Sequence, residues 1–211
     1  MTDSRVFENI YPRVKKFAKA RIVNKKEGAM LQERIEGKWL DCFRRVFALN
    51  GIGKGTRVAI LSESQSRPVL VQLSDLALHD LGAEYCLIQM PTPRQTAPVP
   101  VKSTGTSWAI QQNRAVIEAL KLVEVIVDCT VEGIIHAPEW PEIEDNGNTR
   151  LLVITNEHPE ILERTEPKAE HGPKVQLGIQ MLREAKEMRV TSPAGTDLVV
   201  DLRGAPCGGT A

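Results

Sequence analysis

Apolar positions along the chain fall into two patterns, and their alternation predicts a layered α/β protein. Four short runs are apolar almost throughout, as strands buried on both faces are. These runs begin near residues 56, 83, 124 and 150 and read "TRVAILS", "AEYCLIQM", "EVIVDC" and "RLLVIT". Segments with helical spacing separate them. This βαβ rhythm predicts a doubly wound, mostly parallel, Rossmann-like sheet.

The helices are predicted from apolar residues three and four positions apart and from the residues that end each helix. Residues 30–49 carry the first such face: Leu31, Ile35, Trp39, Leu40, Phe43, Val46 and Phe47. The turn-rich "NGIGKG" follows and ends this helix. The second helix has Ser66 as its predicted N-cap, Pro68 in its first turn and Gly82 just beyond its last turn.

Three further helices are expected in the second half of the chain. One covers residues 113–123, one begins at Pro159 with Asn156 as its cap, and an amphipathic one covers residues 173–188. Two alternating runs around Pro-Ala-Gly then predict a β-hairpin in "RVTSPAGTDLVVDL".

That hairpin shapes the expected domain organisation, because a two-stranded ribbon is marginally stable alone. We expect a basic N-terminal extension at residues 1–29 and an α/β domain at residues 30–188. Residues 189–211 would hold the hairpin and tail that begin a truncated, missing catalytic domain.

Composition narrows the class of protein. Of the 211 residues, 42% are hydrophobic and 26% charged, as in ordinary globular proteins. No apolar run reaches the about 18 residues that cross a bilayer, and the N-terminus lacks a secretory or transit pattern. We therefore expect no membrane partner and a cytoplasmic location.

Charge and cysteine usage exclude further classes. The first fifty residues hold twelve Lys or Arg against six Asp or Glu, although the whole chain is formally neutral. Aromatic residues make up only 4%, so this basic stretch favours a solvated face over nucleic-acid binding. The four cysteines are widely spaced, which predicts neither a zinc site nor a disulfide framework.

Polar loops after the predicted strands are the candidate ligand sites, because ligands of open α/β sheets bind at the carboxyl edge. "SESQS" follows the first strand, where Ser62 and Ser64 could face an anion and Ser66 could simply cap the next helix. Residues 99–114 could form a substrate lid, an anion cradle or a plain polar loop. "GIGKG" precedes a strand instead of a helix, so it is interpreted as a turn.

The richest cluster follows the third strand, in "VIVDCTVEGIIHAPEWPE". Asp128 ends the strand, and Glu132, His136 and Glu139 come within the next eleven residues. His136 could shuttle a proton or hydrogen bond a polar ligand, or it could be an ordinary loop histidine. A local metal site is disfavoured because no second histidine lies nearby. Glu139 is predicted in the first turn of a helix.

Five segments, taken in order, resemble the N-terminal half of a metal-dependent enzyme family. The family contains 2,5-dihydroxypyridine 5,6-dioxygenase and the thermophilic leucyl aminopeptidases of the aminopeptidase T type. The segments are "VAILSESQSRPVLVQLSDLAL", "VPVKSTGTSWAIQQNRAVIEAL", "VDCTVEGIIHAPE", "VITNEHPEILER" and "MRVTSPAGTDLVVDLRGAPCGG". The resemblance runs from about residue 30 to the end of the sequence.

The resemblance implies an α/β N-terminal domain and a C-terminal domain that supplies the metal ligands. Those ligands are His, His and Asp for Fe(II) in the dioxygenase, and none of the positions is present here. His136 matches a histidine that faces the substrate, and Ile135 matches an apolar pocket residue. Asp128, Glu132, Ser62 and Ser64 are candidates by position alone.

The expected function is therefore the N-terminal domain of a ring-cleaving, metal-dependent dioxygenase, inactive alone and without a cofactor of its own. The full-length family would act on a small aromatic substrate, with His136 orienting or deprotonating it. A leucyl aminopeptidase-like fragment, with another divalent metal, and a non-catalytic binding or assembly module stay open as alternatives. So does a homo-oligomer.

Overall fold

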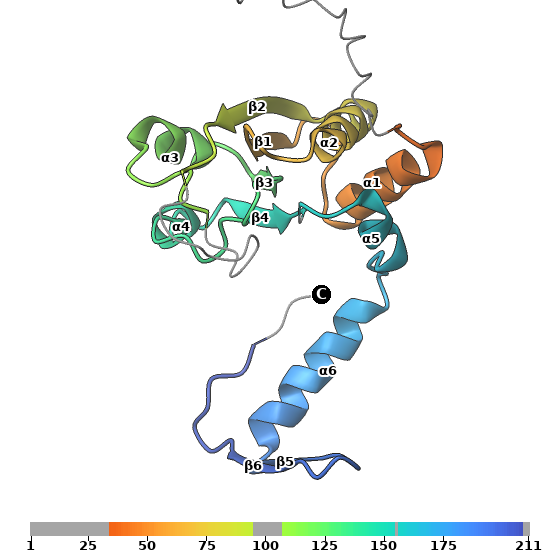
Figure 1. Ribbon diagram of the computed structural model, residues 1–211, viewed down its shortest axis with the longest axis vertical. Helices are drawn as coiled ribbons and strands as arrows, with labels where there is room; N and C mark the ends of the chain where they lie inside the picture. The colour runs from red at the N-terminus through yellow and green to blue at the C-terminus, as the bar shows by residue number, and fades with distance from the viewer. Residues whose placement is uncertain (1–33, 95–106, 155, 209–211) are drawn as a thin grey trace, which may run out of the picture. The chain divides into compact units, whose positions relative to one another are not determined.

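A four-stranded parallel sheet organises the protein, whose computed structural model describes residues 34–94, 107–154 and 156–208. The strands are β1 (Arg57–Glu63), β2 (Glu84–Met90), β3 (Val125–Asp128) and β4 (Arg150–Val153). Their order is β2-β1-β3-β4, and every neighbouring pair is parallel (Figure 1). Starting from β1, the next strand is added on one side as β2, and β3 and β4 are added on the other side. The predicted parallel α/β class is confirmed.

Helices cover both faces of the sheet, and each face has its own apolar core. On one face, Val58 and Ile60 of β1 pack with α1 (Gly37–Leu49) and α2 (Pro68–Leu81). On the other, Ala59 and Leu61 pack with α3 (Arg114–Leu120) and α4 (Trp140–Glu144). Successive residues of a strand point to opposite faces, so one buried apolar run supplies both cores.

The first two helices begin differently from their predictions. Residues 30–33 lie outside the described residues, and α1 begins only at Gly37. The expected cap of α2 is wrong, because Arg67 occupies the N-cap position without a side-chain cap bond. The Ser66 hydroxyl instead accepts a hydrogen bond from the Glu63 backbone N–H at 2.7 Å. At the other end, Gly82 adopts a left-handed φ of 71° and ends α2 as predicted.

A second correction concerns Asn156, the predicted cap of α5 (Pro159–Arg164). His158 is the N-cap, and its Nδ1 accepts from the Glu160 backbone N–H at 3.3 Å. The Asn156 side-chain oxygen accepts from the backbone N–H of Arg67 at 2.7 Å, and so serves the start of α2. In α3, by contrast, Asn113 caps the first turn through Val116 N–H, but the helix ends at Leu120.

The last elements are α6 (His171–Glu184) and an antiparallel hairpin of β5 (Glu187–Thr191) and β6 (Asp197–Asp201). The helix ends four residues before the predicted position, and β5 takes the residues that follow. All helices and strands belong to one unit, Ile35–Ala211. The predicted basic extension at residues 1–29 lies outside the described residues. No described helix is long and apolar enough to cross a membrane.

Candidate functional site at the carboxyl edge of the sheet

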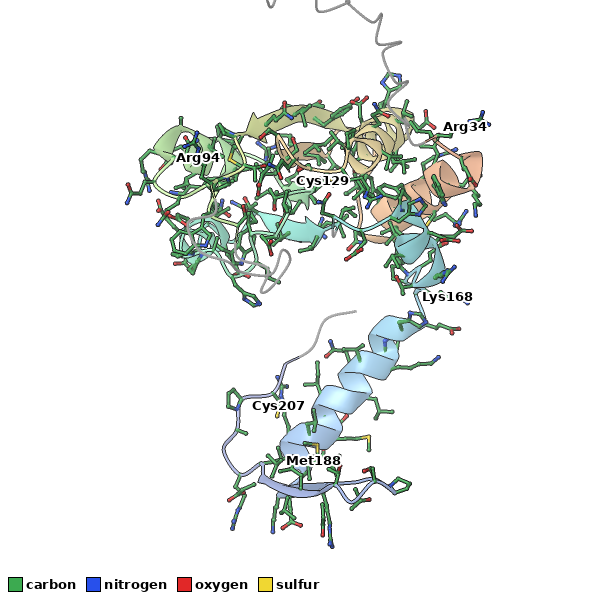
Figure 2. The ribbon with its side chains drawn as sticks, viewed as in Figure 1. Arg34, Arg94, Cys129, Lys168, Met188 and Cys207 are labelled. Carbon is green, nitrogen blue, oxygen red and sulfur yellow. The ribbon has the colours of Figure 1, made fainter. Side chains whose placement is uncertain are left out.

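The polar residues of the site gather where β1 and β3 end side by side. Leu61 of β1 is in register with Asp128 of β3, so Ser62 and Glu63 extend just past the last residue of β3. The strand order changes direction between these two strands, and such switch points are where α/β sheets bind ligands. Cys129, which follows β3, lies among the side chains of the α/β part in Figure 2.

Asp128 organises the turn that follows β3. Its side chain is 1% exposed, and one carboxylate oxygen accepts from the Thr130 backbone N–H (2.9 Å) and hydroxyl (2.6 Å). The other oxygen accepts from the Ile134 N–H at 2.7 Å. Burial still raises the pKa of Asp128, although these hydrogen bonds oppose the rise; the charge of Glu63 adds to it.

The turn presents two exposed side chains between two buried anchors. Ile134 and Ala137 are 0% and 2% exposed and belong to the core beneath α3 and α4. Ile135 and His136 between them are both exposed. Gly133 makes the sharp entry possible, because its φ of 78° is costly for a residue with a Cβ. Ile135 and His136, two of the predicted site residues, are therefore exposed at the expected edge.

A second loop meets this turn through Ser107. The Ser107 hydroxyl donates to a carboxylate oxygen of Glu63 at 2.5 Å, and the Ser107 backbone N–H donates to the Gly133 carbonyl at 2.5 Å. Glu63 is 2% exposed and Ser107 2%. Sequence reasoning did not select Glu63. The available signal was a carboxylate at the end of an otherwise apolar strand run.

The remaining predicted residues occupy different positions. Ser62 is buried, and its hydroxyl has no hydrogen-bond partner within the described residues. By alternation it lies on the opposite face of β1 from Glu63. Ser64 is exposed, and its hydroxyl accepts from the Thr92 backbone N–H at 3.0 Å. Glu132 is half-buried beside the turn.

Three predictions from other loops have separate outcomes. Glu139 is the N-cap residue of α4, one position before the predicted first turn, and accepts from the Gln112 N–H at 3.3 Å. Lys102 and Gly105, the centre of the predicted lid or cradle, lie outside the described residues. "GIGKG" forms the helix-to-strand turn that was predicted.

The described side chains do not fit a resident metal ion. Within residues 34–94, 107–154 and 156–208, no three His, Cys, Asp or Glu side chains are grouped so that they could hold one. Glu63 and Asp128 are buried carboxylates at the edge, and the hydroxyl and amide donors described above already engage them. The metal implied by the sequence resemblance has no ligand set in this part of the chain.

Fold and edge together define an α/β protein with an exposed turn at its topological switch point. The family model for 2,5-dihydroxypyridine 5,6-dioxygenase matches residues 38–211. The chain therefore belongs to the 2,5-dihydroxypyridine 5,6-dioxygenase family.

Two relatives from Pseudomonas putida KT2440 agree with that assignment. A curated 2,5-dihydroxypyridine 5,6-dioxygenase is 27% identical over 159 residues, covering 74% of this chain and 44% of the relative. A solved 2,5-dihydroxypyridine dioxygenase structure matches with a TM-score of 0.69 and 26% identity, covering 77% of this chain and 46% of that one. The chain thus spans less than half the length of both relatives.

Proposed function

We propose that this chain supplies the substrate-facing wall of a ring-cleaving dioxygenase that acts on a small hydroxylated aromatic ring. The observation that carries the proposal is the turn after β3, which exposes Ile135 and His136 at the switch point between two buried anchors. Membership of the dioxygenase family supports the reaction class, and the name of the curated relative supports the class of substrate.

The two exposed side chains have complementary chemistry for such a ring. Ile135 offers apolar surface to a ring face, and the His136 imidazole can accept a proton from a ring hydroxyl or donate a hydrogen bond to it. Ionising a ring hydroxyl makes the ring richer in electrons, which favours attack by an electrophilic oxidant. We assign His136 the role of orienting or deprotonating the substrate.

The metal ligands of the functional protein are proposed to lie outside the described residues. No described group of side chains fits a metal, so the described chain contributes binding and orientation instead of oxygen activation. We accordingly propose that this chain alone turns over no substrate. The aminopeptidase alternative stays an untested prediction, since both relatives are dioxygenases by name.

The first test is a titration of 2,5-dihydroxypyridine into the isotopically labelled chain, followed by NMR of the histidine rings. Saturable shifts of the His136 signals are expected. Replacing His136 by Ala should weaken binding about 5- to 10-fold, because one hydrogen bond to the ring is lost. The matched control is His79→Ala, which removes an exposed histidine of α2 and should leave the affinity unchanged.

Three results would contradict the proposal. Equal affinity of the native chain and the His136→Ala variant would remove His136 from the site. Oxygen uptake by this chain alone, with Fe(II) and 2,5-dihydroxypyridine supplied, would contradict the proposal that this chain alone turns over no substrate. Binding of unsubstituted pyridine with the same dependence on His136 would exclude recognition of the ring hydroxyls.

A further inference from the structure

Glu63 is a buried charged group for which the proposed function has no use. Its side chain lies at the carboxyl end of β1, is 2% exposed, and forms no ion pair with any residue in the described part of the chain. A carboxylate is expensive to bury unless its oxygens are hydrogen bonded. What Glu63 does bond is therefore informative.

The hydrogen-bond partner of Glu63, Ser107, contacts two segments that are distant in the sequence, the end of β1 and the turn after β3. Besides donating from its hydroxyl to Glu63, Ser107 donates from its backbone N–H to the carbonyl of Gly133. The same hydroxyl accepts from the Ala109 N–H at 3.2 Å, which fixes its orientation. Glu63 is thus tied through one residue to the turn that carries His136.

We infer that Glu63 is a positioning residue which, through Ser107, holds the turn so that His136 faces the substrate. The inference rests on the proposed function and adds a residue to the same site. Because Glu63 is buried, it acts through Ser107 and not by touching the ring. A hydrogen bond to a carboxylate is stronger than one between neutral groups, which suits a fixed anchor.

The turn then has two anchors that restrain different parts of it. Asp128 accepts from Ile134 N–H and so holds the turn from within, on its own strand. Ser107 holds the Gly133 carbonyl from a neighbouring loop. Losing the second anchor leaves the first intact. The turn should then stay folded but sample more orientations of the peptide units before His136.

Amide hydrogen exchange tests this link without a ligand. Ser107→Ala and Glu63→Met should speed exchange of the Ile134 and Ala137 amides about tenfold or more, because the turn opens locally. Glu63→Gln retains a carbonyl oxygen that can accept from Ser107 and should restore much of the protection. The Ile154 amide, which bonds the Asp128 carbonyl from the residue just after β4, should be unaffected.

The matched control is Ser74→Ala. Ser74 is also fully buried, but its hydroxyl lies 3.6 Å from the Cys129 sulfur on the opposite face of the sheet. The inference is overturned if the control speeds exchange in the turn as much as Ser107→Ala does. It is overturned equally if Ser107→Ala raises exchange at Ile154 by the same factor, since that describes general destabilisation.

Ligand affinity gives the second readout. With 2,5-dihydroxypyridine as the probe, Ser107→Ala should weaken binding about 5-fold in the native background and hardly at all in the His136→Ala background. Fully additive losses would overturn the inference. If the native chain does not bind the probe, the proposed function fails, whereas the exchange experiment still decides whether Glu63 anchors the turn.

Discussion

At the scale of single residues, hydrogen bonding and burial act in opposite directions on the pKa of Asp128. Three hydrogen bonds favour the carboxylate, yet burial outweighs them and raises the pKa of Asp128 above 3.8, the ordinary value for an aspartate. Ionised Asp128 is therefore less favourable in the folded protein than in the unfolded chain. The Asp128 carboxyl therefore fixes the geometry of the turn, but its ionised form disfavours folding.

Asp128→Asn removes that titration and should change how stability depends on pH. The native contribution of Asp128 is fully present below its unfolded pKa and is lost as pH rises through its higher folded pKa. The free energy of unfolding of the native protein, minus that of the variant, should therefore fall as pH rises. Each unit between the two pKa values contributes about 1.4 kcal/mol.

Denaturant unfolding between about pH 3.5 and 7.5 measures this difference. Gly37→Ala, at the first residue of α1, changes no ionisable group; it serves as the control and should give a difference that does not vary with pH. If the difference in free energy of unfolding for Asp128→Asn is also constant with pH, burial does not raise the pKa of this carboxyl.

The sequence pattern located His136 of this site but not Glu63. His136 could be placed at the sheet edge because strand ends are visible in apolar periodicity, whereas Ile135 was selected only through the family resemblance. Glu63 could not be selected, because its importance depends on Ser107, 44 residues away. Contacts of that kind depend on tertiary packing that no local pattern contains.

At the scale of elements, the end of α2 shows how one residue fixes a connection. Gly82 has a φ of 71° and its N–H donates to the carbonyl of His79, so it turns the chain directly into β2. A Cβ there would meet Lys54 only at ordinary contact distance, 3.7 Å. The cost of substitution is therefore one of backbone conformation.

Gly82→Ala should lower the free energy of unfolding by about 1 kcal/mol, because the left-handed conformation is unfavourable for alanine. Gly37→Ala is the matched control, since Gly37 is the first residue of α1 and a Cβ there meets nothing within 4 Å. That control should be neutral or mildly stabilising. Equal losses for both variants would show that the backbone of Gly82 is not the cause.

Elements were predictable in type and order, while two helix starts were not. Helix and strand periodicities placed the parallel strands and the hairpin because both periods are local properties. The Ser66 cap failed because its hydroxyl bonds the Glu63 N–H. The Asn156 cap failed because Asn156 bonds Arg67, 89 residues away, which leaves the α5 cap to His158. A polar residue before a helix therefore indicates a nearby cap only when no distant donor competes for it.

On the scale of the whole molecule, the α/β part and the hairpin differ in how much of their apolar side-chain surface is buried. The central strands β1 and β3 of the sheet are buried between two cores, whereas Met188, Val190 and Leu198 of the hairpin are 39%, 42% and 52% exposed. Val190 and Leu198 are directly opposite in the ladder and share a face. Exposed apolar patches of this kind bind other surfaces.

Replacing Val190 and Leu198 together by Thr should reduce the binding of a hydrophobic dye to the folded chain. The melting temperature of the α/β part should change little, because neither side chain is buried. Val199→Thr is the control: Val199 is 54% exposed but pairs with Arg189 on the other face. Fluorescence titration with the dye measures the effect, and unchanged dye binding would exclude this face as the apolar patch.

The Glu63–Ser107–Gly133 link also bears on the order in which the protein folds. Its members come from three separate segments, so the contact forms only after long stretches of chain have been brought together. The sheet around β1 can consolidate before that happens. The turn carrying His136 should thus be among the last segments to become ordered during folding. It should also be among the first to open in brief native-state fluctuations.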